Sequence, residues 1–285
     1  MARQLLITGA TGTLGRALNR ISELRGLEHR VTTRAELDIA EPSSVQAALE
    51  RNRPWAVINT AGYVRVADAE REPERCYREN TEGAVALAKL CARLGIPYVT
   101  FSSDLVFDGQ LGRAYVETDP PSPACVYGAS KAEAERQVLE IYPDALVVRT
   151  SAFFGPWDQY NFVYHTLSTL ASGHEVSAGA DCIISPTYVP DLVNAALDLL
   201  IDGETGIWHL ANQGAVSWGE FARMAAERGG FDPDRIVLHG TESTPTSTAL
   251  ASVRGEMLPT LHSALDRFFK EAEVPWRSEI GRPAR

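Results

Sequence analysis

The sequence is poor in cysteine and has no cysteine arrangement typical of a metal site or a redox pair. There is no C-x-x-C pair, and no histidine stands at metal-ligand spacing from Cys76, Cys91, Cys125 or Cys182. Such cysteines are typical of free buried thiols, which argues against a disulfide-stapled secreted scaffold and favours a reducing compartment. No metal site is expected.

The chain also lacks a long hydrophobic run and an excess of positive charge. No apolar stretch reaches the roughly 20 residues of a membrane-spanning helix, and the first residues do not resemble a signal peptide. Lysine and arginine number 27 against 37 aspartate and glutamate, a formal net charge of −10. A general nucleic-acid or anionic-membrane surface is therefore not expected. These absences predict a soluble, cytoplasmic protein.

What the sequence does contain is an alternation of short apolar runs and helix-period segments. Strands are predicted at residues 4–10, 29–33, 55–61, 97–103 and 144–155, with helices between them at 12–24, 43–53, 73–95 and from about 126. Alternation of this kind builds a parallel sheet covered by helices. The predicted fold class is α/β, with a Rossmann-type doubly wound sheet.

After about residue 150 the pattern loosens. Helices are predicted at residues 160–172, 188–201, 217–230 and 258–272, with short strands at 182–187 and 206–212. We expect a dinucleotide-binding Rossmann domain over residues 1–150 and a smaller, mainly substrate-binding lobe over 151–285. Segments near residues 183–202 are expected to return to the Rossmann core.

A glycine-rich loop follows the first predicted strand. Backbone N–H groups and the positive end of the next helix bind phosphate in such a loop, where side chains would block its approach. A tight turn with chance glycines is the alternative interpretation. The residues expected to contact a dinucleotide here are Gly9, Thr11, Gly12, Thr13, Leu14 and Gly15.

The end of the second strand indicates which dinucleotide is bound. An NAD site usually has a carboxylate there for the ribose hydroxyls, whereas this chain has Arg34 and no carboxylate before Glu36. Arg16 follows the last glycine of the loop. Two guanidiniums suit the 2′-phosphate of NADPH, because arginine binds phosphate through two hydrogen bonds. NADPH is therefore favoured, with NADH and two solvated surface arginines as the alternative.

Lysine is scarce, and one of the three lysines follows a tyrosine by four residues. Chance produces such a pair in roughly one chain in ten of this composition. Tyr127 and Lys131 share one helix face, and an ammonium beside a phenol lowers the phenol pKa from about 10 toward neutrality. That arrangement suits acid catalysis. A helix-start tyrosine with a solvated lysine is the alternative.

The glycine loop, Ser-Ser-Asp after the fourth strand and Tyr-x-x-x-Lys together resemble the extended short-chain dehydrogenase/reductase family. Within it, the closest likeness is to dTDP-4-dehydrorhamnose reductases, whose segments, in order, resemble INTAGYVRVADAERE, ENTEGAVALAKLC, FSSDLVFDG, VYGASKAEAE, VVRTS and PTYVPDL. The resemblance spans nearly the whole chain. It implies NADPH-dependent reduction of the 4-keto group of a nucleotide-linked 6-deoxy sugar.

The resemblance also implies a role for each matched residue. Tyr127 would give a proton to the sugar carbonyl, Lys131 would lower its pKa and hold the nicotinamide ribose, and Ser103 would hydrogen-bond the carbonyl oxygen. Further cofactor contacts would come from Arg34, Asp38, Ile39, Asn59, Ala61 and Gly62, with Asn80 supporting the site. Substrate contacts would come from Ser103, Asp104, Ala152, Asn161, Phe162 and Pro186. Helix 76–91 is a candidate homodimer surface.

Some substrate-side residues depart from the pattern of that group. Leu105 replaces a tyrosine, Ala152 replaces a tryptophan, and Cys182 and Ile184 replace the glutamine and glycine of Asp-Gln-x-Gly-x-Pro-Thr. Losing an aromatic wall and a polar group changes what a pocket accepts. The sugar and its nucleotide therefore stay open. Leu105 also disfavours a 4,6-dehydratase, which resembles this region but has glutamate after the aspartate.

Three functions are compatible with this sequence. The first is the reductase, the second an epimerase or other tailoring oxidoreductase that keeps NAD bound. The third is a non-catalytic NADP-binding regulatory subunit, similar to the β-subunit of methionine adenosyltransferase. The intact set of Ser103, Tyr127 and Lys131 favours an enzyme, because a non-catalytic module has no chemical need for all three.

Overall fold

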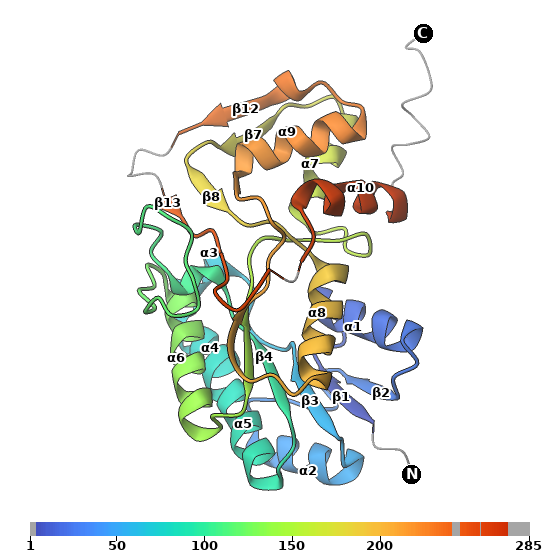
Figure 1. The fold of residues 1–285 in the computed structure, drawn as a ribbon, viewed down its shortest axis with the longest axis vertical. Coiled ribbons are helices and arrows are strands. Elements are labelled where there is room, and N and C mark those ends of the chain that lie inside the picture. Colours follow the sequence, from blue (N-terminus) through green and yellow to red (C-terminus); the bar gives the residue numbers. More distant parts are fainter. Residues whose placement is uncertain (1–3, 241–245, 257, 273–285) are drawn as a thin grey trace.

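The centre of the computed structural model, which describes residues 4–240, 246–256 and 258–272, is a six-stranded parallel sheet. Its strand order is β10-β5-β4-β3-β1-β2, and it occupies the lower part of Figure 1. The strands are β1 (Leu5–Thr8), β2 (His29–Thr32), β3 (Ala56–Asn59), β4 (Tyr98–Phe101), β5 (Leu146–Arg149) and β10 (Gly206–His209). The strands β1, β3, β4 and β5 are buried throughout. The predicted α/β Rossmann-type sheet is confirmed.

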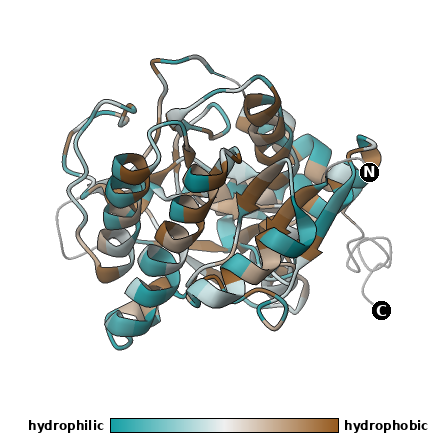
Figure 2. Ribbon diagram, turned by 90° about the horizontal axis from the view of Figure 1, so that it is seen from below, coloured by the Kyte–Doolittle hydropathy of each residue, from teal (hydrophilic) through white to brown (hydrophobic). Residues whose placement is uncertain are grey.

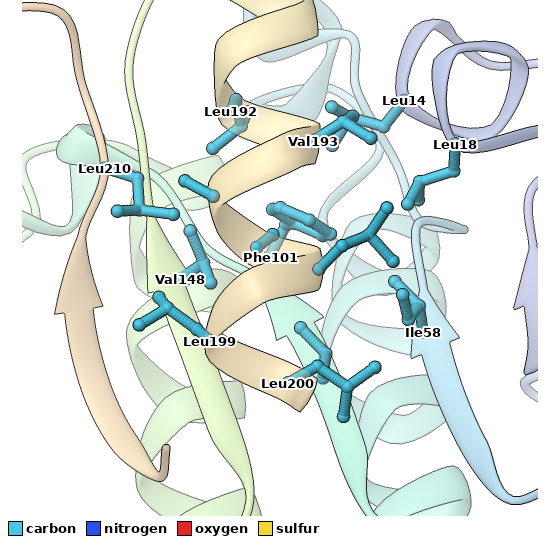
Figure 3. Close-up of a cluster of buried hydrophobic side chains, with 14 of the residues drawn as sticks. Leu14, Leu18, Ile58, Phe101, Val148, Leu192, Val193, Leu199, Leu200 and Leu210 are labelled. Carbon is cyan, nitrogen blue, oxygen red and sulfur yellow. The ribbon is translucent and has the colours of Figure 1, made fainter. Parts of the chain in front are cut away.

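Helices cover both faces of this sheet, which explains the continuous apolar runs of its strands. On one face lie α1 (Thr13–Leu24) and α8 (Val189–Ile201), whose side chains meet those of β3, β4 and β5 in Figure 3. On the other lie α2 (Pro42–Asn52), α5 (Gly83–Leu94) and α6 (Val126–Ile141). Figure 2 shows hydrophobic residues concentrated on the strands and on the inward sides of the helices.

The helix predicted at residues 73–95 contains a π-helical turn. It consists of α4 (Pro73–Tyr77), the π turn η1 (Arg78–Glu82) and α5, and it ends at Gly95 as expected. The wide turn carries Asn80, whose side chain donates to Ser130 of α6 at 3.0 Å and accepts from the Tyr63 N–H at 2.8 Å. Such turns occur frequently at functional sites.

The remaining elements lie largely above the sheet in Figure 1. Small sheets pair β6 (Phe153–Phe154) with β9 (Thr187–Tyr188), β7 (Val176–Gly179) with β12 (Ile236–His239), and β8 (Cys182–Ile184) with both β11 (Val216–Ser217) and β13 (Thr246–Ser247). The helices here are α7 (Phe162–Ala171), α9 (Trp218–Gly229), the 3₁₀ turn η3 (Pro233–Arg235) and α10 (Leu261–Glu271). Two short helices, α3 (Val66–Ala69) and the 3₁₀ turn η2 (Asp104–Val106), follow β3 and β4.

Two predicted strands are each divided in the structure. The segment 144–155 forms β5 and β6, separated by a turn in which Ala152 has φ +37°. The segment 182–187 forms β8 and the start of β9, with Pro186 between them. Proline lacks a backbone donor for a sheet, so the run of apolar residues cannot continue as one strand.

The chain returns to the parallel sheet after residue 188. Helix α8 packs over the sheet together with α1, and β10 pairs with β5 as the edge strand. The earlier strands β8 and β9 pair instead with β11, β13 and β6. Among the described residues, no helix combines the length and the apolar character that crossing a membrane requires.

Candidate active site

A cavity of about 780 Å³ lies where the carboxyl ends of the sheet strands meet the C-terminal part of the chain. The strand order reverses between β3 and β1, and ligands bind beside such a switch point in α/β sheets. Segments following β1, β4 and β5 line the cavity together with residues near 182–184 and 246–248. The predicted cofactor and substrate residues that line it are Thr11, Gly12, Thr13, Leu14, Arg16, Ser103, Asp104, Tyr127 and Ala152.

The glycine loop has the shape of a phosphate cradle. Gly9 has φ +82°, and a Cβ on Gly15 would stand 2.0 Å from the Gly9 carbonyl oxygen, so neither position accepts a side chain. Gly12 precedes α1, whose first turn has no side-chain cap. The first N–H groups of α1 therefore remain available to an anion at the cavity, where the helix dipole favours negative charge.

Two unpaired hydroxyls also indicate that a polar ligand fits the cavity. The side-chain oxygens of Ser102 and Thr150 are buried and have no hydrogen-bond partner within the described part of the chain. Both residues line the cavity. An unsatisfied buried hydroxyl costs about 1–3 kcal/mol, which a bound ligand would relieve. The cradle and these hydroxyls together fit a dinucleotide cofactor.

The predicted cofactor residues after β3 support the loop from behind. The Asn59 side chain accepts from the Thr8 hydroxyl at 2.7 Å and from the Ala61 N–H at 3.2 Å. A Cβ on Gly62 would stand 2.7 Å from the Asn80 side-chain oxygen and 3.7 Å from Lys131 Nζ. Asn59, Ala61 and Gly62 do not line the cavity itself.

The residues predicted near the adenosine lie after β2. Arg34 is exposed, and its guanidinium contacts Glu79 at 2.9 Å and Asp38 at 3.4 Å. Ile39 is buried against Gly83, with no room for a Cβ there. Arg16, by contrast, lines the cavity. To bind the 2′-phosphate as expected, the Arg34 guanidinium would have to contact it in addition to the carboxylates of Glu79 and Asp38, or in place of them.

Tyr127 lies in the first turn of α6, which a close contact holds against η2. A Cβ on Gly128 would stand 1.9 Å from the Leu105 carbonyl oxygen, so only glycine allows the helix to approach this far. The Cys125 sulfur caps the helix by accepting from the Gly128 N–H at 3.3 Å. This contact brings the Tyr127 phenol near Ser103, whose hydroxyl acts against the burial that raises the phenol pKa.

The electrostatics of the Tyr–Lys pair differ from the expectation. Burial raises the pKa of Tyr127, and the neighbouring Asp104 raises it further, instead of the expected lowering by Lys131. Burial lowers the pKa of Lys131 to about 8. The Lys131 ammonium donates to the Phe101 carbonyl at 3.1 Å and lies 5.9 Å from the centre of the Tyr127 ring. In this structure Tyr127 is therefore a protonated phenol at neutral pH.

Ser103 and Asp104 form a compact hydrogen-bonded group after β4. Ser103 Oγ accepts from the Leu105 N–H at 3.1 Å and donates to Asp104 Oδ1 at 3.0 Å. Asp104 Oδ2 accepts from the hydroxyls of Ser151 and Thr248, each at 2.7 Å. Asp104 is 6% exposed, and its burial raises the pKa of the carboxyl although the three hydroxyls oppose that effect.

Three predicted substrate residues support the cavity without lining it. Asn161 caps α7 by accepting from the Tyr164 N–H at 3.0 Å, and it donates to the Gly155 carbonyl at 3.0 Å. Phe162 packs edge-on against Trp218, with ring centres 4.7 Å apart. Pro186 is buried between β8 and β9. Arg149 of β5 is 1% exposed and bound to Glu135 at 2.6 Å and 2.9 Å.

Several lining residues escape sequence reasoning. Thr248 reaches Asp104 from a position 144 residues later in the chain, and Trp218 lines the cavity as well as packing on Phe162. In the sequence, the only indication that Thr248 belongs to the site was the hydroxyl-rich stretch that ends there. Asp158 also lines the cavity, where it accepts from the Tyr160 N–H at 2.9 Å and from the Thr13 hydroxyl at the start of α1.

Metal ligands do not gather in the described structure. Across residues 4–240, 246–256 and 258–272, no group of three or more histidine, cysteine, aspartate or glutamate side chains is placed to hold an ion. The cysteines Cys76, Cys91, Cys125 and Cys182 are free thiols. The polar side chains that line the cavity include hydroxyls, the Tyr127 phenol, the carboxyls of Asp104 and Asp158, and the Arg16 guanidinium.

Comparison with known proteins identifies the family. Residues 3–281 match the model of the RmlD substrate binding domain. The chain is 35% identical over 268 residues to a dTDP-4-dehydrorhamnose reductase of Streptomyces griseus, covering 92% of this chain and 85% of the relative. It is 35% identical to a dTDP-4-keto-6-deoxy-D-glucose reductase of Streptomyces niveus, covering 83% and 82% of the two chains.

A solved structure agrees with the sequence matches. The dTDP-4-dehydrorhamnose reductase of Bacillus anthracis, in complex with NADP, superimposes with a TM-score of 0.89 at 31% identity, covering 95% of this chain and all of the other. The fold, the glycine cradle and the Tyr–Lys helix thus occur in a chain that matches this reductase structure over almost its full length. The chain belongs to the RmlD substrate-binding domain family of extended short-chain dehydrogenases/reductases.

Proposed function

We propose that the protein reduces the 4-keto group of a nucleotide-linked 6-deoxy sugar with NADPH. The observation that carries this proposal is that Tyr127 and Ser103 meet at one cavity, which the phosphate cradle at the start of α1 also lines. The similarity to dTDP-4-dehydrorhamnose reductases, at 35% identity over 92% of the chain, supports the same substrate class. The activity is that of an NAD(P)-dependent oxidoreductase.

The chain offers each part of the cofactor a partner. The first N–H groups of α1 would hold the pyrophosphate, Lys131 the nicotinamide ribose, and Arg16 with Arg34 the 2′-phosphate. Bound there, NADPH would supply the hydride. The NADP complex of the Bacillus anthracis reductase supports NADPH over NADH. The contacts of Asp38, Ile39, Asn59, Ala61 and Gly62 with the cofactor remain part of this proposal.

Tyr127 provides the proton that a carbonyl needs during reduction. The raised pKa keeps the phenol protonated at neutral pH, so it is a donor before the reaction and its hydrogen is transferred as charge develops on the carbonyl oxygen. The ammonium of Lys131 would favour the phenolate that remains. Because the proton arrives while the charge develops, no alkoxide accumulates.

The substrate side gives room for a sugar whose identity the replaced residues leave open. Ala152, at the position where the resemblance implies a tryptophan, lines the cavity, and so do Cys182, Ile183 and Ile184. We propose that residues 1–150 bind the cofactor and that 151–285 mainly bind the substrate. Contacts of Asn161, Phe162 and Pro186 with the sugar are indirect in this view.

Two further properties belong to the proposal. Free cysteines support a reducing compartment such as the cytoplasm. Helix 76–91 is the candidate homodimer surface, and the mass of the protein in solution, measured by light scattering, tests whether a dimer forms. A monomer at all concentrations would contradict the proposed dimer and leave the proposed reaction unaffected.

Absorbance of NADPH tests the proposed reaction. The purified protein is offered dTDP-4-keto-6-deoxyglucose, with and without a 3,5-epimerase that presents the epimerised sugar. We expect NADPH oxidation, and a kcat lower by about 10²–10⁴-fold in Tyr127→Phe, the contribution of a general acid. The variant should bind NADPH as the wild type does, measured by nucleotide fluorescence.

Two results would contradict the proposal. Undiminished turnover by Tyr127→Phe would remove the phenol as the proton donor. NADPH binding without oxidation of either sugar would point to another nucleotide sugar or to the regulatory alternative. Tightly held NAD after purification would instead favour the epimerase.

A further inference from the structure

Asp104 is a buried carboxyl that the family resemblance counts as a substrate contact but that the proton transfer described so far does not use. It lies at the start of η2, 6% exposed, and it is surrounded by hydroxyls from three separate segments: Ser103 beside it, Ser151 after β5 and Thr248 near the C-terminal end. The titratable group that interacts with it is the Tyr127 phenol of α6. Within the described residues, no arginine or lysine is among the groups that shift the pKa of this carboxyl.

The hydrogen bonds of Ser103 define the problem. A serine hydroxyl has one hydrogen and two lone pairs. One lone pair of Ser103 is taken by the Leu105 N–H at 3.1 Å, and its hydrogen points to Asp104 Oδ1 at 3.0 Å. One lone pair then remains, and the neighbouring Tyr127 phenol can donate into it. With Asp104 ionised, the Ser103 hydrogen therefore points away from a substrate carbonyl, and Ser103 can take up the Tyr127 hydrogen as well.

A neutral Asp104 reverses the direction of these hydrogen bonds. Its own hydrogen on Oδ1 can donate to Ser103 Oγ, while Oδ2 still accepts from Ser151 and Thr248. The hydrogen of Ser103 is then released toward the cavity, and the Tyr127 hydrogen no longer has a lone pair of Ser103 to fill. Both hydrogens become available to a carbonyl oxygen, which needs donors and offers none.

We propose that Asp104 is a positioning residue that works as the neutral acid and turns the hydroxyl hydrogens of Ser103 and Tyr127 toward the sugar carbonyl. This inference rests on the proposed reduction. Burial without a neighbouring cation favours the neutral form, which agrees with the raised pKa of this carboxyl. Asp104 itself needs no contact with the sugar in this role.

Asp104→Asn and Asp104→Leu separate the two forms. In the asparagine variant the amide N–H₂ can donate to Ser103 while its oxygen accepts from Ser151 and Thr248, which copies the neutral acid permanently. We expect Asp104→Asn to keep kcat near that of the wild type, and Asp104→Leu, similar in size but without a donor, to lose about 100-fold, as for a removed transition-state donor. NADPH affinity should be unchanged in both.

The pH profile gives a readout that a purely structural role would not move. If activity needs neutral Asp104, kcat falls as the pH rises through the pKa of this carboxyl. The wild type should show this fall in its pH profile, and Asp104→Asn should lack it. The separate limb of Lys131 near about 8 should remain in both. Thr248→Val removes a hydrogen bond that stabilises the Asp104 carboxylate. Its loss raises the pKa of Asp104, so the fall in kcat should shift to higher pH in this variant.

Infrared difference spectroscopy makes the test independent of turnover. A protonated carboxyl band at neutral pH, present in the wild type and absent in Asp104→Asn, is expected. Absence of that band throughout the active pH range would overturn the inference, as would an Asp104→Asn protein that folds, binds NADPH and is as inactive as Asp104→Leu. A wild type that reduces no 4-keto sugar but shows the band would instead contradict the proposed function.

Discussion

At the scale of single residues, the site is governed by burial more than by neighbouring charge. The phenol of Tyr127 is held in its protonated form, and the pKa of the Lys131 ammonium falls to about 8. Both shifts have the desolvation of the charged form as their first cause. In the proposed reaction this pair combines a proton donor with a buried cation that destabilises the fold, a typical exchange of stability for activity.

Lys131→Met should therefore stabilise the protein while it abolishes reduction. Because the folded state lowers this pKa from 10.5 to about 8, the unfolded chain binds the proton more strongly. The resulting loss of stability is complete below about pH 8 and is relieved as the pH rises toward 10.5. We expect a higher Tm at pH 7 and a kcat lower by about 100-fold or more.

Thermal unfolding and NADPH oxidation measure the two effects. Lys89→Met, which removes an exposed lysine of α5, is the matched control and should change neither. A lower Tm for Lys131→Met across the whole pH range would mean that the bond to the Phe101 carbonyl outweighs the desolvation of the ammonium.

At the scale of elements, two glycines of the loop between β1 and α1 serve different purposes, one for packing and the other for ligand binding. A Cβ on Gly15 would stand 2.0 Å from the Gly9 carbonyl oxygen, whereas one on Gly12 would meet its nearest atom at 3.5 Å. Gly15 is thus required by the turn itself. Gly12 is required only if a ligand approaches the backbone closely.

Alanine at these two positions should give different defects. Gly15→Ala should destabilise the fold by about 1–3 kcal/mol, the usual effect of overpacking. Gly12→Ala should keep the stability of the wild type and bind NADPH at least about tenfold more weakly, because its methyl group occupies the phosphate approach. Denaturant unfolding and fluorescence titration measure the two. Unchanged affinity in Gly12→Ala would place the pyrophosphate elsewhere.

At the scale of the whole molecule, the two parts of the chain are joined across the cavity. Thr248 bonds to Asp104 at 2.7 Å from the C-terminal side. The loop between β6 and α7 meets α1 twice, through Asp158 on the Thr13 hydroxyl and through Trp157, whose ring lies 4.8 Å from the Arg20 guanidinium. A carboxylate therefore stands at the helix end that favours anions.

Asp158→Asn should bind NADPH a few-fold more tightly. Removing a negative charge next to the expected pyrophosphate relieves repulsion, and the gain should shrink with added salt. Calorimetric titration at low and high ionic strength measures this. Asp202→Asn at the end of α8 removes an equal charge from an exposed position and should have little effect. Weaker binding in Asp158→Asn would mean that the carboxylate helps to orient Thr13 for the cofactor.

Local periodicity was enough for much of the architecture. Alternation of apolar runs and helical segments predicted the parallel sheet, and the glycine spacing predicted the turn between β1 and α1, because both depend on contacts within a few residues. Breaks inside apolar runs were missed. The divisions at Ala152 and Pro186 depend on which neighbouring strand each piece pairs with, and this is not a local property.

The sequence by itself determined the class of sheet, the glycine turn before α1 and the Tyr127–Lys131 pair on one helix, since each depends on residues close together in the chain. Tertiary structure decided the electrostatics. The pKa of Tyr127 rises because burial removes water from the phenol, and Asp104 is surrounded by Ser151 and Thr248 from distant segments. Desolvation and long-range hydrogen bonds depend on what the folded chain brings together, and no local pattern encodes them.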